Sequence, residues 1–179
     1  EVAKDLPQKI EQIRYCELSK AQREVYQSLL EEGRRMIAGS EGGQRRMLAL
    51  TALLRLRQAC CDLRLLDLPD VNEHDGSVKM QELSGLLDEA VEGGHRVLVF
   101  SQFVQMLQGI VPVLADRGFD FCYLDGQTRN RGDVVRRFQD SAIPVFLISL
   151  KAGGVGLNLT GADTVIHVDP WWNPAVEAQ

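Results

Sequence analysis

The sequence predicts an α/β fold, in which a doubly wound parallel sheet with helices on both faces is preceded by a small helical subdomain. From residue 78 onward, short runs of consecutive apolar residues alternate with segments that have helical spacing. Strands that are apolar on both faces are typical of a parallel sheet covered by helices. Right-handed crossovers between such strands then give a layered α/β domain. Between residues 19 and 60, by contrast, two long segments show helical spacing alone.

The first part of the chain is predicted to hold one short strand and two helices. Residues 10–18 (IEQIRYCEL) alternate between apolar and polar side chains, which favours a strand. Ser19 and Gln22 have the spacing of a capping box, so a helix is expected from there to about residue 38. A glycine-rich break at residues 39–43 precedes a second helix over residues 44–60.

The second part supplies the sheet. Residues 67–77 are polar and rich in turn-forming residues, and they mark the internal boundary. Helices are predicted over residues 78–93, 102–117 and 130–140, and strands over residues 96–100, 121–124, 144–149 and 164–168. Ligands of doubly wound sheets bind at the carboxyl ends of the strands. The unusual residues of this chain follow those ends: Ser101-Gln102, Asp125 to Thr128, Ser149 to Gly156, and Asp169 to Pro174.

The composition narrows the class of protein. A hydrophobic content of 45% supports a packed core, and no apolar run approaches the length of a membrane span. The cysteines, Cys16, Cys60, Cys61 and Cys122, form no Cys-x-x-Cys pair, so we expect reduced thiols and no zinc site. The net charge of −5 counts against a broad nucleic-acid surface, but a local patch with backbone amides can still bind phosphates.

Motifs for independent nucleotide chemistry are missing. No lysine follows a glycine, so the chain has no P-loop. Asp88-Glu89 is the one Asp-Glu pair, and it falls within a predicted helix rather than at a strand end. The dinucleotide fingerprint fails because Leu159 stands where a third glycine or alanine is needed.

The glycine-dense turn after the third strand of the sheet is a candidate anion site. Ser149, Lys151 and exposed amides around Gly153, Gly154 and Gly156 together make a nest for phosphate. The same glycines also fit a purely structural tight turn. This chemistry alone does not distinguish ATP from DNA.

Residues 147–174, LISLKAGGVGLNLTGADTVIHVDPWWNP, closely resemble motif V and the segment after it in Swi/Snf-type ATP-dependent DNA translocases. These chromatin-remodeller-like enzymes of helicase superfamily two are built from two RecA-like lobes. Residues 97–103 resemble motif IV of that family, residues 124–128 its Leu-Asp-Gly-x-Thr element, and residues 48–66 its helical protrusion. The resemblance implies a connector strand (1–18), a helical protrusion (19–75) and a C-terminal RecA-like lobe (76–179).

The resemblance assigns site residues to two ligands. It implies contact with double-stranded DNA by Ser101, Gln102, Thr128, Ser149, Lys151, Ala152, Trp172 and Asn173, with Lys79 and Arg131 as further candidates. It implies a nucleotide cleft at Gly154, Gly156, Asn158 and Gln179. Structural alternatives stay open: Trp171 and Trp172 also suit a core, and Lys79 and Arg131 also suit a solvated helix surface.

The resemblance further implies half of a motor. The chain starts with Glu1 and stops at Gln179, where motif VI and its arginine fingers begin in the family, so we expect a longer protein. An N-terminal RecA-like lobe of the same polypeptide would complete the site for ATP and Mg²⁺. This chain alone is expected to hold no catalytic residue, no tightly bound cofactor and no metal, and to lack ATPase activity.

We also expect a monomer with no membrane association, located inside the cell on DNA, in a nucleoid or a nucleus. The alternative is a stand-alone helicase-lobe-like module that binds nucleotide or another protein without motor activity.

Overall fold

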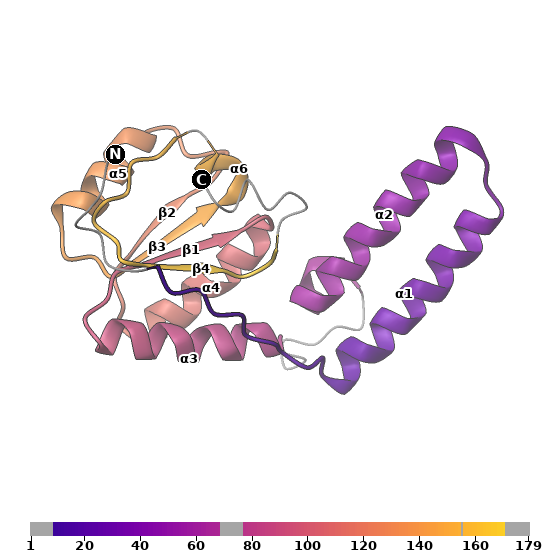
Figure 1. The fold of residues 1–179 in the computed structure, drawn as a ribbon, viewed down its shortest axis with the longest axis horizontal. Coiled ribbons are helices and arrows are strands. Elements are labelled where there is room, and N and C mark those ends of the chain that lie inside the picture. The colour runs from indigo at the N-terminus through magenta and orange to yellow at the C-terminus, as the bar shows by residue number, and fades with distance from the viewer. Residues whose placement is uncertain (1–8, 69–76, 155, 171–179) are drawn as a thin grey trace.

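The computed structural model describes residues 9–68, 77–154 and 156–170, which form a helical hairpin beside a layered α/β lobe (Figure 1). The hairpin consists of α1 (Lys20–Ala38) and α2 (Gly42–Cys61), followed by the short 3₁₀ helix η1 (Leu63–Leu66). The lobe consists of α3 (Val78–Glu92), β1 (Val97–Ser101), α4 (Val104–Asp116), β2 (Phe121–Leu124), α5 (Arg131–Asp140), β3 (Val145–Ser149), α6 (Leu150–Gly153) and β4 (Thr164–His167).

Local side-chain chemistry explains why the hairpin forms. The predicted capping box is confirmed, because the Ser19 hydroxyl accepts from the Gln22 amide at 3.1 Å and the Ser19 amide donates to the Gln22 side chain at 3.4 Å. The same Gln22 side chain, buried against α2, donates to the Ala59 carbonyl at 3.0 Å. Leu29, Leu56 and Ala59 then form part of one apolar seam between the two helices.

The strand predicted over residues 10–18 is wrong. Residues 9–19 form no helix or strand, and Ile10, Ile13 and Tyr15 are 81%, 77% and 90% exposed. An alternating pattern yields a strand only where a sheet edge can pair with it, and none in the described ranges does so. The predicted break at residues 39–43 is shorter than expected, since Gly42 and Gly43 already belong to α2.

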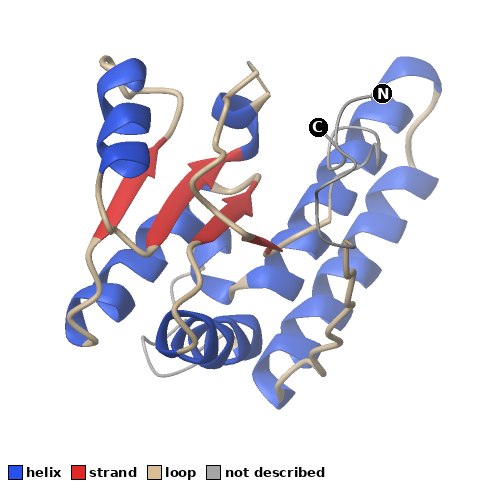
Figure 2. Ribbon diagram, turned by 60° about the vertical axis from the view of Figure 1, so that its left-hand side comes forward, coloured by secondary structure: helices blue, strands red, loops and turns tan. Residues whose placement is uncertain are grey.

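The four strands form one parallel sheet in the order β2-β3-β1-β4. Alternate residues of β3 point to opposite faces: Val145 and Leu147 join the core under α3 and α4, whereas Phe146 and Ile148 join the core under α5 and α6. Figure 2 shows these helices on the two sides of the sheet. The predicted doubly wound class is therefore confirmed.

The sequence predicted the boundaries of the sheet's strands and long helices to within two residues. It missed η1 and α6, each of which has four residues. Most of the predicted boundary at residues 67–77 lies outside the described residues. No helix in the described part has both the length and the apolar character that a membrane crossing requires.

Candidate nucleic-acid and nucleotide interface

The sheet topology brings the carboxyl ends of the four parallel strands to one edge, the strand-end edge. β1 and β3 are neighbours, but α4 after β1 packs on one face and α6 after β3 packs on the other. Ligands of α/β sheets bind at the carboxyl ends of two neighbouring strands whose following helices lie on opposite faces of the sheet. In Figure 1 this edge of the sheet faces the helical hairpin.

The end of β1 is closed by a buried carboxylate. The Ser101 hydroxyl donates to Asp169 Oδ1 at 2.5 Å, and the Gln102 amide lies 3.3 Å from both carboxylate oxygens. Asp169 is 1% exposed, and this burial raises its pKa against the opposing effects of Ser101, Gln102, Lys79 and Arg57. One carboxylate therefore ties the end of β1 to the segment that follows β4.

The end of β3 turns directly into α6. The Ser149 hydroxyl accepts from the Ala152 amide at 3.3 Å and so caps this short helix. Gly153 packs against the Phe100 ring, and a Cβ at this position would come within 2.9 Å of Phe100 Cε1. Glycine is therefore required for α6 to lie this close to β1.

The loop after α6 presents exposed groups. Lys151, Gly154, Gly156 and Asn158 are exposed, and Gly156 has a φ of +69°, which favours glycine. The Gln139 side chain of α5 holds the far side of this loop. Its amide nitrogen donates to the Asn158 carbonyl at 3.1 Å, and its oxygen accepts from the Gly161 amide at 2.7 Å.

The end of β2 carries a self-contained turn. Asp125 Oδ1 accepts from the amides of Gln127 and Thr128 at 2.9 and 3.1 Å. The Thr128 hydroxyl accepts from the Asp125 amide at 3.0 Å and lies 3.2 Å from Asp125 Oδ1. Thr128 is half-buried, and the first residue of α5, Arg131, is half-buried close behind it in the chain.

The predicted DNA-contacting residues differ in exposure. Ser101, Ser149 and Ala152 are 0%, 2% and 1% exposed, so these side chains are buried in this conformation, and their contact with DNA stays a prediction. Their role here is structural: the two hydroxyls form internal hydrogen bonds and the methyl group joins the core. Lys151 is exposed and Gln102 is half-buried.

The further candidate Lys79 is bonded to a backbone carbonyl of the lobe. The Lys79 ammonium donates to the Val168 carbonyl at 3.0 Å, so it is held at the end of β4. Trp172, Asn173 and Gln179 lie outside the described residues.

The thiols and carboxylates of the described part do not form a metal site. No group of three or more His, Cys, Asp or Glu side chains there is arranged to hold an ion. Cys61 is buried, and this burial raises its pKa to about 12. At neutral pH its thiol is therefore protonated and unreactive. Asp88-Glu89 lies within α3 as expected, where Asp88 pairs with Arg117.

Comparison with known proteins decides the family. The model of the helicase conserved C-terminal domain matches residues 78–179, and the model of the SNF2-related domain matches residues 1–65. The chain belongs to the helicase conserved C-terminal domain family. The Swi/Snf-type resemblance predicted from motifs IV and V is confirmed.

Relatives and solved structures agree with this assignment. The chain is 36% identical over 184 residues to the putative ATP-dependent helicase/translocase YwqA of Bacillus subtilis, covering 100% of this chain and 20% of the relative. It is 37% identical over 191 residues to the human SWI/SNF-related matrix-associated actin-dependent regulator of chromatin subfamily A member 1, covering 100% of this chain and 18% of the relative. The chain thus spans about one fifth of the length of these relatives.

The fold matches structures from Sulfolobus solfataricus. The SWI2/SNF2 ATPase C-terminal domain superposes with a TM-score of 0.78 at 32% identity, covering 92% of this chain and 74% of that one. The SWI2/SNF2 ATPase core in complex with double-stranded DNA gives 0.83 at 31% identity, covering 96% and 37%. The RecA-like lobe predicted from the sequence is thereby confirmed.

The sequence did not reveal the residues whose internal hydrogen bonds and ion pairs hold the site segments in place. Asp169 was noted only as part of a strand-end pattern, although a carboxylate directly after an apolar strand is a usable signal. Gln139 and Arg57 gave no such signal, because each is one polar residue on a helix whose partner lies far away in sequence.

Proposed function

We propose that this chain is the C-terminal lobe of an ATP-dependent translocase that moves along double-stranded DNA. In this proposal the strand-end edge forms one wall of a nucleotide cleft and, beside it, a binding surface for the DNA backbone. The observation that carries the proposal is the exposed Lys151 on α6, a few residues before the exposed Gly154, Gly156 and Asn158. One short segment can in this way contact both ligands.

The contacts to DNA phosphates are assigned to side chains of the strand-end edge that are exposed or half-buried. Lys151 supplies the charge, and Gln102, Thr128 and Arg131 supply further donors. Ser101, Ser149 and Ala152 act indirectly, since they hold the ends of β1 and β3 in place. Trp172 and Asn173 are proposed to extend this binding surface, and Lys79 reaches it only if it leaves the Val168 carbonyl.

The nucleotide side is proposed at Gly154, Gly156, Asn158 and Gln179. The sequence has no P-loop, so an N-terminal lobe of the same polypeptide would bind the phosphates of ATP. Carboxylates of that lobe would hold Mg²⁺, because the described part of this chain lacks a metal cluster. Arginine fingers after Gln179 would complete the site, and their loss costs about 10³–10⁵ in rate in related phosphoryl-transfer sites.

Movement follows from two lobe arrangements with different affinity for ATP. Binding favours a closed cleft and hydrolysis favours an open one, so the DNA-binding surface of this lobe shifts relative to the other lobe in each cycle. α6 carries Lys151 and leads directly into the loop that begins at Gly154. A displacement of this loop on the nucleotide side therefore also moves Lys151 on the DNA side.

The proposal is tested by Lys151→Ala in the complete two-lobe protein. Loss of a phosphate contact should lower DNA-stimulated ATPase more than DNA-free ATPase. The slope of log K for DNA binding against log salt concentration should become shallower by about one, because one fewer counterion is released. Lys20→Ala is the matched control, because Lys20 is an exposed lysine on α1 whose side chain pairs only weakly, at 3.9 Å, with Glu24 of the same helix. Equal loss of both ATPase rates would move Lys151 to the nucleotide side and contradict the assignment.

A second test uses the chain of residues 1–179 by itself. We expect it to fold but to hydrolyse no ATP, with or without DNA, because it has no P-loop. Folding is checked by circular dichroism and hydrolysis by phosphate release. DNA-stimulated phosphate release above background would refute the two-lobe proposal.

A further inference from the structure

A polar joint connects the helical hairpin to the strand-end edge of the lobe. Arg57, near the end of α2, lies with Nη2 3.8 Å from Asp169 Oδ2 and donates from the same nitrogen to the Pro170 carbonyl. Asp169 in turn holds the Ser101 hydroxyl and the Gln102 amide at the end of β1. Three parts of the chain, α2, the end of β1 and the segment after β4, therefore meet at one carboxylate.

Two further contacts tie the same end of the hairpin to the lobe. The Ser77 hydroxyl, which caps α3, donates to the Cys61 carbonyl at the end of α2. The first turn of α3 also supplies Lys79, whose ammonium donates to the Val168 carbonyl immediately before Asp169. The base of the hairpin is thus fixed to α3 and to the end of β4 at separate points.

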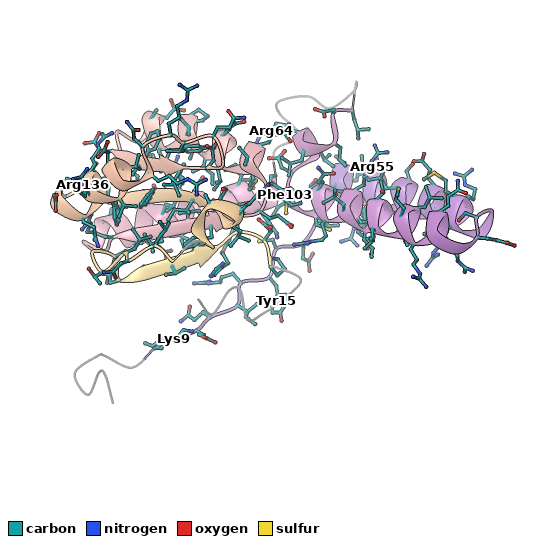
Figure 3. All side chains as sticks on the ribbon, turned by 90° about the horizontal axis from the view of Figure 1, so that it is seen from above. Lys9, Tyr15, Arg55, Arg64, Phe103 and Arg136 are labelled. Atoms are coloured by element: carbon teal, nitrogen blue, oxygen red, sulfur yellow. The ribbon has the colours of Figure 1, made fainter. Side chains whose placement is uncertain are left out.

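The joint is shielded from solvent. The side chains of Arg57 and Asp169 are 19% and 1% exposed, whereas the exposed ion pairs of this structure, such as Lys9–Glu11, lie at 76% and 74%. Removing one partner of a shielded pair leaves the other charge without compensation, whereas surface pairs contribute little. Figure 3 shows the side chains around this junction, with Arg55 labelled on the hairpin and Phe103 on the lobe.

The position of the joint in the chain gives it a consequence for function. Asp169 and Pro170 come shortly before Trp172 and Asn173 in the sequence, which are proposed to contact DNA, and Asp169 also accepts from the Gln102 amide. A rotation of the hairpin base therefore pulls on the start of one proposed DNA-contacting segment and on the end of another.

We propose that Arg57 is a positioning residue that acts through Asp169, so that the orientation of the hairpin sets how far the DNA-binding surface moves in each ATP cycle. This inference rests on the proposed function and adds to it. Arg57 contacts neither ligand. Its effect belongs to the efficiency with which hydrolysis is converted into movement, and DNA-free hydrolysis does not depend on it.

The experiment compares Arg57→Met with Arg55→Met in the complete protein. Arg55 lies two positions earlier on the same helix and is also half-buried, but it has no ion pair in the described part of the chain. We expect Arg57→Met to lower the distance moved per ATP by about two- to thirtyfold, the range typical of residues that transmit coupling, with DNA-free ATPase retained. Arg55→Met should leave both quantities near the wild-type values.

Partial rescue and a double-mutant cycle separate positioning from general damage. Arg57→Lys keeps a charge that can reach Asp169, so it should restore part of the lost movement. Asp169→Asn removes the charge that pairs with Arg57 but keeps one side-chain oxygen that can accept from Ser101 and Gln102. It should lower movement per ATP on its own, and combining it with Arg57→Met should add little, because the ion pair is already broken in either single variant. Additive losses, or equal losses of movement and of DNA-free hydrolysis, would overturn the proposal.

Failure of the proposed function would look different. A wild-type protein that neither binds a DNA duplex nor shows DNA-stimulated ATPase would remove the translocase proposal and this inference with it. A wild-type protein that moves along DNA, while Arg57→Met moves equally far per ATP, would remove the inference alone. Movement is measured by displacement of a triplex-forming strand from a duplex, with ATP consumption followed in the same reaction.

Discussion

The α/β lobe of this chain buries its apolar side chains more completely than the helical hairpin does. In the lobe, all five residues of β3 are buried, and the helices cover both faces of the sheet. In the hairpin, α2 buries Leu56 and Ala59 against α1 but leaves Met47, Leu50, Leu53 and Leu54 exposed. Of the nine exposed large hydrophobic residues among the described ones, eight lie between residues 10 and 54.

This difference shows where the stability of the described chain resides. A helix whose apolar residues are not gathered on one face is typical of one with several neighbours, but in the described part of the chain α1 is the helix that packs along α2. The hairpin therefore depends on one seam, its caps and the joint at its base. The lobe depends on a closed core, where each side chain has partners all around it.

The largest contrast is expected between two leucines. Leu107 of α4 is fully buried against the sheet, so Leu107→Ala should lower the free energy of unfolding by about 2–5 kcal/mol. Leu50 of α2 is 65% exposed, so Leu50→Ala should change it by no more than about 0.5 kcal/mol. Urea unfolding followed by circular dichroism measures both. A loss for Leu50→Ala as large as that for Leu107→Ala would show that the exposed face of α2 is buried in solution.

A second contrast concerns two glycines inside helices. A Cβ at Gly33 of α1 would lie 2.9 Å from the Ala52 Cβ of α2, whereas nothing lies within 4 Å of one at Gly85 of α3. Gly33→Ala should therefore destabilise the hairpin by about 1–3 kcal/mol through overpacking, in spite of alanine's better helix propensity. Gly85→Ala should stabilise the lobe by about 0.5–1 kcal/mol.

Residue-resolved hydrogen exchange checks this pair, because it reports the two regions separately. Faster exchange should be confined to α1 and α2 in Gly33→Ala, and slower exchange should be confined to α3 in Gly85→Ala. Stabilisation of the hairpin by Gly33→Ala would show that the helices can separate without cost, and the seam would then contribute less than the contacts indicate.

The sequence predicted the lobe better than the hairpin surroundings, for a physical reason. Strands such as 145–149 are buried on both faces, so every residue carries the same apolar signal and the element is easy to recognise. Residues 10–18 carry an alternating signal whose meaning depends on a neighbour, and in the described residues that neighbour is absent. The short α6 was missed because a four-residue helix has no periodicity to detect, and only the Ser149 cap announces it.

The candidate site was predictable as a place rather than as a set of contacts. Strand-end residues identified the candidate edge of the sheet, because parallel strands bring their carboxyl ends to one edge. Whether a given side chain faces solvent could not be read from the sequence. Ser101 and Ser149 look like ligand-binding hydroxyls in a motif, yet the long-range partner Asp169 and the local cap of α6 occupy them. Such competition between ligand and internal hydrogen bonds is decided by tertiary structure.

The smallest expected effect tests how much the capping box holds the hairpin together. In Ser19→Ala the Gln22 amide loses the hydroxyl that accepts from it, whereas the Ser19 backbone amide can still donate to the Gln22 side chain, which also donates to the Ala59 carbonyl. We expect a loss of about 1 kcal/mol, as is typical for removal of an N-cap. Ser28→Ala is the matched control, because Ser28 is exposed within α1 and has no side-chain hydrogen bond in the described part of the chain. Hydrogen exchange in the first turn of α1 should rise only in Ser19→Ala. If exchange near Ala59 rises as well, the N-cap of α1 and the apolar contacts between α1 and α2 open together as one cooperative unit.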